Sequence, residues 1–416
     1  DITTYHYDKF GRLAFSQNAR QRDLGVYSYT LYDNPSRITE TGQVPIPAAG
    51  MTYVTNAQVH SASDNIKTYV RGRNRKYVTT TVYDQAMLNL QQSGLDAQTN
   101  LQNRVSSILY TPSLTTVQDP TSYFTHASHF SYDVTGNVKT LVQDQPQLDY
   151  INQRFKRIDY DYDLLSGKVN QLSYNRGKAD QYYHKYEYDA DNRITEVRTS
   201  NDGVQWDRDA AYTYYKHGPL AEVKLGDMNL QNLQYAYTIQ GWLKAINADV
   251  LNEDADMGKD GQSNPLMPKD VFAHALDYHT GDYKAIGTED FMRTTGGSPL
   301  TGSLYNGNIA RQTTAIHGTD NLQRNYRYDQ LNRLLTATYA DVDNTTFAVT
   351  TVPNDGFKNT YSYDADGNIT SLLRKDGSGT TFDNLQYHYQ NTTNNKLSYV
   401  TDLSSNRIAG DLDIAP

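Results

Sequence analysis

The 416-residue chain contains no cysteine, so it can form neither a disulfide nor a thiolate metal site. It has only 2 tryptophans and 10 phenylalanines, and no apolar run approaches the roughly 18 residues that a membrane-spanning helix needs. Hydrophobic residues make up 37% of the chain and the mean hydropathy is −0.74, which is lean for a thick core. Tyrosine is the one abundant aromatic residue, with 36 copies. This composition favours a thin sheet with one wet face.

The charges are scattered, with 38 Lys and Arg against 47 Asp and Glu and a net charge of −9. No basic stripe is present, which argues against binding to nucleic acid through its phosphates. The sequence also contains no nucleophile elbow, phosphate-binding loop or dinucleotide fingerprint. We therefore expect no catalytic residues, no cofactor, no nucleic-acid partner and no membrane span.

What the chain does contain is one motif written many times: Tyr-x-Tyr-Asp, two residues, Gly or Asn, a polar residue and an aliphatic. The best copies, one of which begins with Phe, are Tyr5-His6-Tyr7-Asp8 with Gly11, Phe130-Ser131-Tyr132-Asp133 with Gly136, Tyr186-Glu187-Tyr188-Asp189 with Asn192, Tyr326-Arg327-Tyr328-Asp329 with Asn332, and Tyr361-Ser362-Tyr363-Asp364 with Gly367. Self-similarity at this scale is typical of array architectures.

Each copy predicts a β-hairpin. Side chains alternate along a strand, so the two tyrosines share one face, where an aromatic ring with a polar tip suits a half-wet sheet. Aspartate suits the first position of a type I turn, and glycine three residues later tolerates a left-handed backbone, as does asparagine. The turn thus accounts for Asp8 and Gly11, and the aliphatic that follows begins the return strand.

The copies are unevenly spread. Hairpins are expected in residues 1–44, 130–247 and 326–400, whereas 45–130 are irregular and 248–325 are rich in insertions. The second tyrosines of neighbouring copies, Tyr162, Tyr188, Tyr214 and Tyr237, follow at 26, 26 and 23 residues, which predicts loops of varying length between hairpins. We interpret residues 1–416 as one continuous all-β segment, and expect it to be a fragment of a longer protein.

These motifs resemble the Rhs/YD-repeat family, over nearly the whole chain. Three stretches, Gln240–Asn247, Tyr305–Ile309 and Tyr328–Leu334, look like the region just upstream of the core in bacterial Rhs proteins. The resemblance implies a long β-ribbon that spirals into a hollow shell around a C-terminal toxin, as in the related cocoon subunits of Tc toxins and the barrel of teneurins. It also implies a secreted or surface protein of bacteria. The family's core motif, of Asp-Pro-x-x-Gly type, is absent, since Asp119-Pro120 continues differently and lies far from the end.

Two constellations suggest metal sites. Asp256-x-Gly258-x-Asp260, with Asp254 nearby, resembles a degraded calcium loop, but the twelfth position is Met267, which offers no oxygen. A solvated acidic loop is the simpler interpretation of Asp254, Asp256 and Asp260. His126 and His129 could offer two imidazoles, but on a strand this spacing points them to opposite faces.

Three functions remain open after this reading. The first is a non-enzymatic shell that wraps a cargo polypeptide, the chain's own C-terminal toxin or effector. The second is an extracellular adhesion or glycan-binding module, because aromatic faces can stack on sugars. The third is a shell piece that assembles with other chains of a secretion or injection machine, which would cover its unpaired sheet edges.

Overall fold

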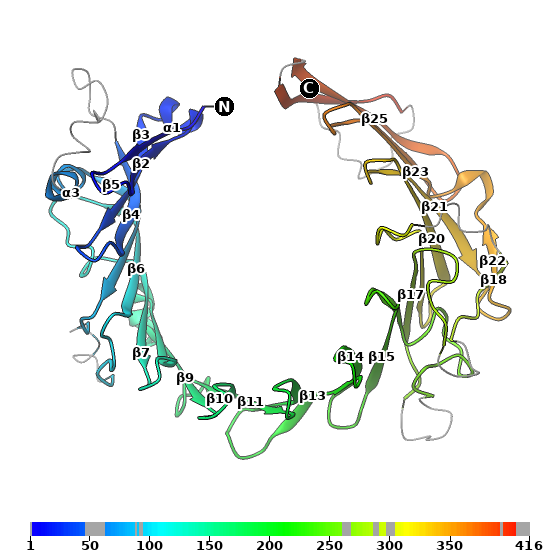
Figure 1. Ribbon diagram of the computed structural model, residues 1–416, viewed down its shortest axis with the longest axis horizontal. Coiled ribbons are helices and arrows are strands. Elements are labelled where there is room, and N and C mark those ends of the chain that lie inside the picture. Colours follow the sequence, from blue (N-terminus) through cyan, green and yellow to red (C-terminus); the bar gives the residue numbers. More distant parts are fainter. Residues whose placement is uncertain are drawn as a thin grey trace. The chain divides into compact units, whose positions relative to one another are not determined.

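Figure 1 shows the computed structural model, which describes residues 2–45, 63–87, 90, 95–259, 268–285, 291–296, 304–391 and 394–404. Nearly all of its regular structure is antiparallel β-strand, which confirms the predicted all-β class. The chain forms two compact units. The first unit consists of Asp1–Asn192 and Arg198–Trp206, and the second of Arg193–Val197 and Asp207–Pro416.

In the first unit, strands pair with their neighbours in sequence order, two to a hairpin. The elements are β1 (Thr4–Tyr7), β2 (Leu13–Gln17), α1 (Ala19–Asp23), β3 (Val26–Tyr32), β4 (Ile38–Pro45), α3 (Ser63–Arg71), β5 (Arg75–Tyr83), β6 (Val105–Leu114), β7 (His126–Tyr132), β8 (Val138–Asp144), the 3₁₀ helix η1 (Pro146–Ile151), β9 (Phe155–Tyr162), β10 (Val169–Tyr174) and β11 (Tyr182–Tyr188). Strand β12 (Ile194–Ser200) follows, and its residues divide between the units.

The second unit repeats this arrangement with one side excursion, a short parallel pairing of β18 with β22. Its elements are β13 (Asp207–Tyr214), β14 (Leu220–Leu225), β15 (Gln231–Tyr237), β16 (Leu243–Ile246), β17 (Phe272–Asp277), β18 (Thr295–Gly296), β19 (Arg311–Ile316), β20 (Asn321–Tyr328), β21 (Leu334–Val342), β22 (Ala348–Thr351), η2 (Pro353–Asp355), β23 (Asn359–Tyr363), β24 (Ile369–Lys375), β25 (Thr381–Asn391) and β26 (Asn394–Asp402).

A β-bulge recurs at the same place in the hairpins of both units. The register shifts where the second tyrosine of the motif faces the aliphatic residue after the turn. Examples are the pairs Tyr7–Leu13, Tyr132–Val138, Tyr214–Leu220, Tyr328–Leu334 and Tyr363–Ile369. A bulge bends the strand that carries it and increases the local twist, so each hairpin receives its bend at an equivalent position.

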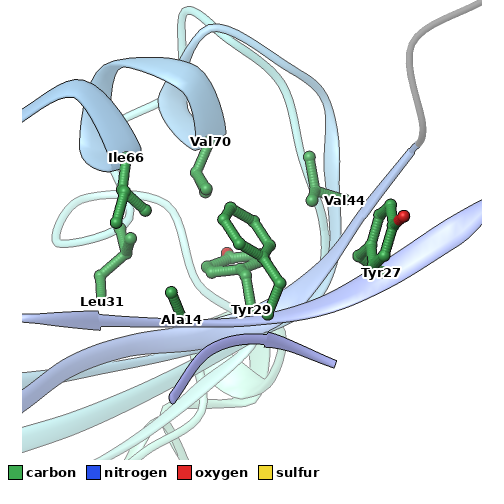
Figure 2. Close-up of a cluster of buried hydrophobic side chains, with 8 residues drawn as sticks. Ala14, Tyr27, Tyr29, Leu31, Val44, Ile66 and Val70 are labelled. Atoms are coloured by element: carbon green, nitrogen blue, oxygen red, sulfur yellow. The ribbon is translucent and has the colours of Figure 1, made fainter. Parts of the chain in front are cut away.

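Helix α3 covers the sheet of the first unit (Figure 2). Its apolar residues Ile66 and Val70 lie four apart, on one face, and both are buried. Opposite them, β3 alternates strictly between buried and half-buried residues and presents Tyr27, Tyr29 and Leu31 to the helix. The sequence did not predict α3, because only one short amphipathic face marks it within an irregular stretch.

The core of the second unit is built mainly from alanine. A large set of small side chains packs around one phenylalanine: Ala236, Ala245, Ala248, Ala255, Ala273, Ala275, Ala315 and Phe291. Leu251, Met257, Tyr283 and Met292 pack against this cluster from the segments outside the hairpins. Small side chains on β15, β16, β17 and β19 therefore leave room for the inserted segments to lie close to the sheet.

The prediction that insertions fall between hairpins is only half right, because two of them fall inside a turn. Tyr83 of β5 pairs with Val105 of β6, and the amide of Asp84 donates to the carbonyl of Arg104 at 3.2 Å, across an excursion of the chain. In the second unit, β17 pairs with β19 although β18 lies between them in sequence. A hairpin of this kind keeps its closing pair and tolerates a long insertion at its tip.

Candidate functional site

The Tyr-Asp turn is the most repeated polar feature of the chain, and the first copy shows its chemistry. The Asp8 amide donates to the Arg12 carbonyl at 2.8 Å, and the Gly11 amide donates to the Asp8 carbonyl at 2.9 Å. The Asp8 carboxylate accepts the amides of Phe10 and Arg12, both at 2.9 Å. Asp8 therefore closes the turn with its side chain as well as its backbone.

The structure places the equivalent residues of the other copies in the same geometry. Asp133, Asp189, Asp329 and Asp364 each accept at least one turn amide at their carboxylate. The residue three further on has a left-handed backbone in each copy: φ is 75° at Gly11, 105° at Gly136, 61° at Asn192, 62° at Asn332 and 92° at Gly367. Asparagine thus takes the place of glycine without changing the turn.

Hydrogen bonds lower the pKa of four of these carboxylates, those of Asp8, Asp133, Asp329 and Asp364. The Thr135 hydroxyl, together with the side chain and amide of Asn137, lowers the pKa of Asp133 to about 2. For Asp8, burial alone would raise the pKa, but hydrogen bonds from Arg12 and Phe10 bring it below its usual value. A proton acceptor this weak is poorly suited to general base catalysis near neutral pH.

In most copies of the motif, the second tyrosine connects one hairpin to the one before it. Its hydroxyl donates to the carbonyl of the aliphatic residue at the preceding bulge, and we call this contact the tyrosine joint. Nine joints are present in the described part of the chain: Tyr32 to Leu13, Tyr132 to Val105, Tyr162 to Val138, Tyr188 to Val169, Tyr214 to Ile194, Tyr278 to Leu243, Tyr328 to Ile309, Tyr363 to Leu334 and Tyr389 to Ile369, at 2.8–3.1 Å.

The tyrosine joint comes with a fixed strand register. Across eight of the nine joints, the structure gives the strand pairing, and the residue two after the aliphatic pairs with the residue three before the tyrosine. These pairs are Phe15–Tyr29, Ser107–His129, Thr140–Asp159, Gln171–Lys185, Ala245–Ala275, Arg311–Asn325, Thr336–Thr360 and Ser371–Gln386. The same register occurs at Glu222–Gln234 and Glu40–Thr80, beside Tyr237 and Tyr83, which form no joint among the described residues, so the pairing of the strand backbones determines it.

Arginines add a second contact between successive turns. The residue after the left-handed position of the turn, which is Gly, Asn or, before Arg37, Ser36, places its guanidinium over the ring of the next second tyrosine. The pairs are Arg12 over Tyr32, Arg37 over Tyr83, Arg193 over Tyr214 and Arg333 over Tyr363, at 4.2–4.7 Å. Arg333 also donates to the Asp364 carbonyl of the next turn at 2.9 Å and forms an ion pair with its own Asp329. Cation–π stacking and hydrogen bonds thus tie each turn to its successor.

The first tyrosines are used less uniformly. Tyr326 donates to Gln312 at 3.0 Å, and Tyr186 stacks on His184 with ring centres 6.3 Å apart. Tyr361 pairs with Leu372 across the sheet, whereas Tyr5 is 55% exposed. These residues pack the sheet face without a common hydrogen bond. The sequence predicted a sheet role for both tyrosines but missed the joint, because the tyrosine and the aliphatic that it bonds are separated by anything from 19 to 35 residues.

The candidate calcium loop is only partly described, because Asp260 lies outside the described residues. The Asp256 carboxylate accepts the Gly258 amide at 2.9 Å, and the Asp254 carbonyl accepts the Arg293 side chain at 3.0 Å. In the residues that the structure describes, no group of three or more His, Asp or Glu side chains could hold a metal ion. The described contacts of Asp254 and Asp256 are therefore those of a folded loop.

One buried cluster has the residue types of a hydrolytic triad. The Ser107 hydroxyl lies 2.7 Å from Nδ1 of His129, whose Nε2 lies 3.7 Å from the Asp144 carboxylate. Burial would raise the pKa of Asp144, but His129 and two bonds from Arg154 hold it low. Ser107, His129 and Asp144 are all at least 98% buried, so the hydroxyl lies inside the fold and not on its surface. His126, three residues earlier, is exposed, as expected for the opposite face.

A second buried cluster lies in the second unit. The Lys244 ammonium bonds Asp277 at 2.5 Å and Asp282 at 2.8 Å, and Arg311 bonds the other oxygen of Asp277 at 2.6 Å. Burial would raise the pKa of Asp277, but the two cations hold it below its usual value. Two positive and two negative groups balance one another, as buried charges require.

The comparisons with known proteins identify no family. No protein-family model and no curated protein matches the chain. Among solved structures it is similar to a chain of the Tc holotoxin pore of Photorhabdus luminescens, with 12% identity and a TM-score of 0.29 over 96% of this chain and 20% of that one. It is also similar to a porin-like protein from Bacteroides uniformis, with 7% identity and a TM-score of 0.21 over 76% and 84%.

The chain thus spans about a fifth of the length of the Tc toxin chain that it matches. Both TM-scores lie below 0.5, so neither likeness carries an argument about function. Among the helices of the described residues, none combines the length and apolar character needed to cross a membrane.

Proposed function

We propose that this chain is a non-catalytic structural wall, secreted or at the surface of a bacterium, that encloses a polypeptide cargo. The observation that carries the proposal is the tyrosine joint. It recurs nine times among the described residues and engages the motif's phenol hydroxyl in the architecture each time. In the same motif, the aspartate carboxylate is also occupied, because it accepts the amides of its own turn. The motif is therefore suited to building a wall by repetition.

The repeated bulge supports the idea that the wall curves. It recurs at the equivalent pair of successive hairpins, such as Tyr328–Leu334 and Tyr363–Ile369. Bends of the same kind at equivalent positions add up along a ribbon, whereas bends at random positions would cancel. A ribbon that bends in one sense turns one face toward an enclosed space.

The choice of cargo rests on the resemblance to Rhs proteins, in which the enclosed polypeptide is a C-terminal toxin. A glycan-binding module is less favoured, because sugars stack on the open face of an aromatic ring, and Arg12, Arg193 and Arg333 already lie over the rings of Tyr32, Tyr214 and Tyr363. Burial also raises the pKa of second tyrosines such as Tyr188 and Tyr363. The buried Ser107 favours a non-catalytic role.

Small-angle X-ray scattering tests the enclosed space. A solid globule of 416 residues has a radius of gyration of roughly 22 Å. A wall around a cavity should give a clearly larger value and a pair-distance distribution shifted to long distances. A radius of gyration near that of a solid globule would refute the shell.

Enclosure of cargo is tested by protease protection. A protease-sensitive polypeptide fused behind Pro416 should be digested more slowly than the same polypeptide added in trans. Equal rates would argue against enclosure. A glycan-array signal abolished by replacing exposed tyrosines, such as Tyr5 and Tyr7, would favour the adhesion module instead.

A further inference from the structure

One buried lysine of the second unit lies between two carboxylates. The Lys244 ammonium contacts Asp277 at 2.5 Å and Asp282 at 2.8 Å, and the three residues are between 3% and 8% exposed. Lys244 lies on β16, Asp277 is the last residue of β17, and Asp282 lies in the segment that follows. Neither the tyrosine joints nor the proposed cargo accounts for this buried arrangement.

The two carboxylates differ in their other partners. Arg311 donates to the second oxygen of Asp277 at 2.6 Å, so Asp277 keeps a cation even when Lys244 is neutral. The second oxygen of Asp282 accepts the backbone amide of Tyr278 at 2.8 Å, which is a neutral donor. When a proton passes from Lys244 to Asp282, both groups become neutral. The charges that remain are those of Asp277 and Arg311, which pair with each other.

We propose that an intramolecular isopeptide bond forms between Nζ of Lys244 and Cγ of Asp282, and that Asp277 moves the protons. Burial favours the product, because a neutral amide replaces two charges that are costly to keep out of water. Asp277 retains its ion pair with Arg311 throughout. The proposal goes beyond the wall and is independent of any cargo.

The step exchanges a carbon–oxygen bond for a carbon–nitrogen bond and releases water. Once Lys244 has given a proton to Asp282, a free amine lies beside a neutral carboxylic acid. The amine nitrogen attacks Cγ of Asp282, and the Tyr278 amide donates to the oxygen on which negative charge develops. Attack makes the nitrogen positive and its proton acidic, so even a weakly basic carboxylate such as Asp277 accepts that proton. Asp277 then returns it to the departing hydroxyl group, so an ammonium and a carboxylate become an amide and one water molecule.

The bond lies where two strands share little pairing. Strand β16 has four residues, and the structure gives one residue pair with β17, Ala245–Ala275, whereas β17 and β19 share six. Lys244 and Asp282 are 38 positions apart in sequence. A covalent link between them closes this loop and restricts the unfolded chain. The link therefore holds β16 to the end of β17 and secures the inserted segment between them.

The first unit provides a matched comparison. Nζ of Lys156 contacts Asp180 at the same distance of 2.5 Å, but the Asp180 side chain is 41% exposed. Among the described residues, Asp180 is the one carboxylate that Lys156 contacts. Water stabilises both charges at this exposed site, and no second carboxylate is placed to move protons. Proximity alone would link both pairs, whereas the proposed chemistry links Lys244 only.

The intact mass of the full chain tests the proposal directly. We expect a mass lower than that of the sequence by one water molecule, in freshly purified protein or after prolonged incubation at neutral pH. Proteolysis and tandem mass spectrometry should find the peptide of Lys244 joined to that of Asp282, and the peptides of Lys156 and Asp180 separate. An unchanged mass after incubation would overturn the proposal, as would a loss of water that maps to other residues.

A succinimide also forms with loss of one water molecule and must be distinguished. Asp-Gly steps such as Asp202-Gly203 are the sites where it is expected. Hydroxylamine opens a succinimide but leaves an isopeptide bond intact. A loss of water that hydroxylamine reverses would therefore count against the link, and one that persists with the joined peptides would support it.

Three variants assign the roles. Lys244→Arg keeps the charge without the amine, and Asp282→Ala removes the carbon that is attacked, so both should keep the full mass. Asp277→Asn retains both reacting groups and should form the link about a hundred-fold more slowly. Linkage of Asp277→Asn at the parent rate would overturn the role of Asp277, whereas Lys156→Arg should link as the parent does. The parent chain decides on the bond without any variant, and scattering and protease protection test the wall separately.

Discussion

The two units pack side chains of very different size against their sheets. In the first unit, Phe15, Tyr29 and Leu31 pack under the helix α3. In the second unit the same layer consists of alanines around Phe291, with inserted segments lying close to the strands. Large side chains keep a helix at a distance and bury much apolar area, whereas alanines permit close approach and bury little.

The buried charges differ in the same way. In the first unit, Glu40 accepts the Tyr29 hydroxyl and the Arg75 guanidinium, both within a mainly apolar core. In the second unit, Lys244 serves two carboxylates at once. The turns and joints, by contrast, are the same in both units. The repeat therefore determines how hairpins connect, and the residues between repeats determine what covers them.

The largest effect should come from removing Lys244. Lys244→Met leaves Asp282 without its cation and Asp277 with Arg311 alone, and breaking a buried pair from one side costs about 3–5 kcal/mol. Hydrogen exchange should show loss of protection in the second unit, with the first unit unaffected. Lys216→Met, at an exposed lysine of the second unit, is the control.

The counterpart in the first unit is Arg75→Met, which leaves Glu40 with Tyr29 and only a distant Arg71 at 3.9 Å. Its loss of protection should be confined to the first unit. If either substitution loosened both units equally, the units would not be independent cores, and the comparison between them would fail.

Core volume should give the next largest effect, with opposite changes in the two units. Leu31→Ala in the first unit opens a cavity and should cost about 2–5 kcal/mol. Ala245→Leu in the second unit overfills a tight layer and should cost about 1–3 kcal/mol. Chemical denaturation followed by hydrogen exchange in each unit measures both. A stabilising Ala245→Leu would show that the alanine layer is loosely packed.

Removing the hydroxyl of a tyrosine joint should reduce stability less than the core substitutions do, and by the same amount in both units. Tyr162→Phe and Tyr363→Phe each remove one hydroxyl from a carbonyl, which is worth about 1 kcal/mol. Tyr123→Phe, at a tyrosine that is 50% exposed, should change nothing. A clear difference between Tyr162→Phe and Tyr363→Phe would mean that the covering layer, and not the repeat alone, governs the joint.

The sequence predicts the hairpins but not the segments that cover them. The hairpins could be predicted because their determinants are local: an alternating tyrosine pair, an acceptor at the start of the turn and a residue that tolerates positive φ. Asp8 and Gly11 show all of this within a few positions. The segments that cover the two sheets could not be predicted, because the positions of α3 and of the alanine layer depend on packing against strands that are distant in the sequence.

The long turns show the same limit in another form. Tyr83-Asp84 has its closing partner at Arg104-Val105, where Asn103-Arg104-Val105 repeats the Asn-Arg-aliphatic end of the motif. Both parts of the motif are present in the sequence, but a search for contiguous copies misses them because the inserted segment separates the two parts. The buried pairing of Ser107 with His129 leaves no such trace, because it arises from the register between β6 and β7.

The smallest effect is expected from the turn carboxylates, and pH reveals it. The pKa of Asp133 is about 2 in the folded chain, because Thr135 and Asn137 donate to its carboxylate, against about 3.9 when unfolded. A lowered pKa stabilises the fold above the unfolded value, and this contribution is lost as the pH falls from about 4 to about 2. Asp364 in the second unit is shifted in the same direction, chiefly by Asn368.

Asp133→Asn should therefore lower the melting temperature slightly at pH 6 and make no difference near pH 2, where the native carboxyl is itself becoming protonated. Asp364→Asn should do the same in the second unit. Melting curves at several pH values measure the gap between each variant and the parent chain. A gap that stayed constant down to pH 2 would show that the turn depends on the shape of the side chain and not on its charge. The segments that cover each sheet do not contact these exposed turns. A gap that closed in only one unit would therefore show that the covering segments of that unit influence its turns from a distance.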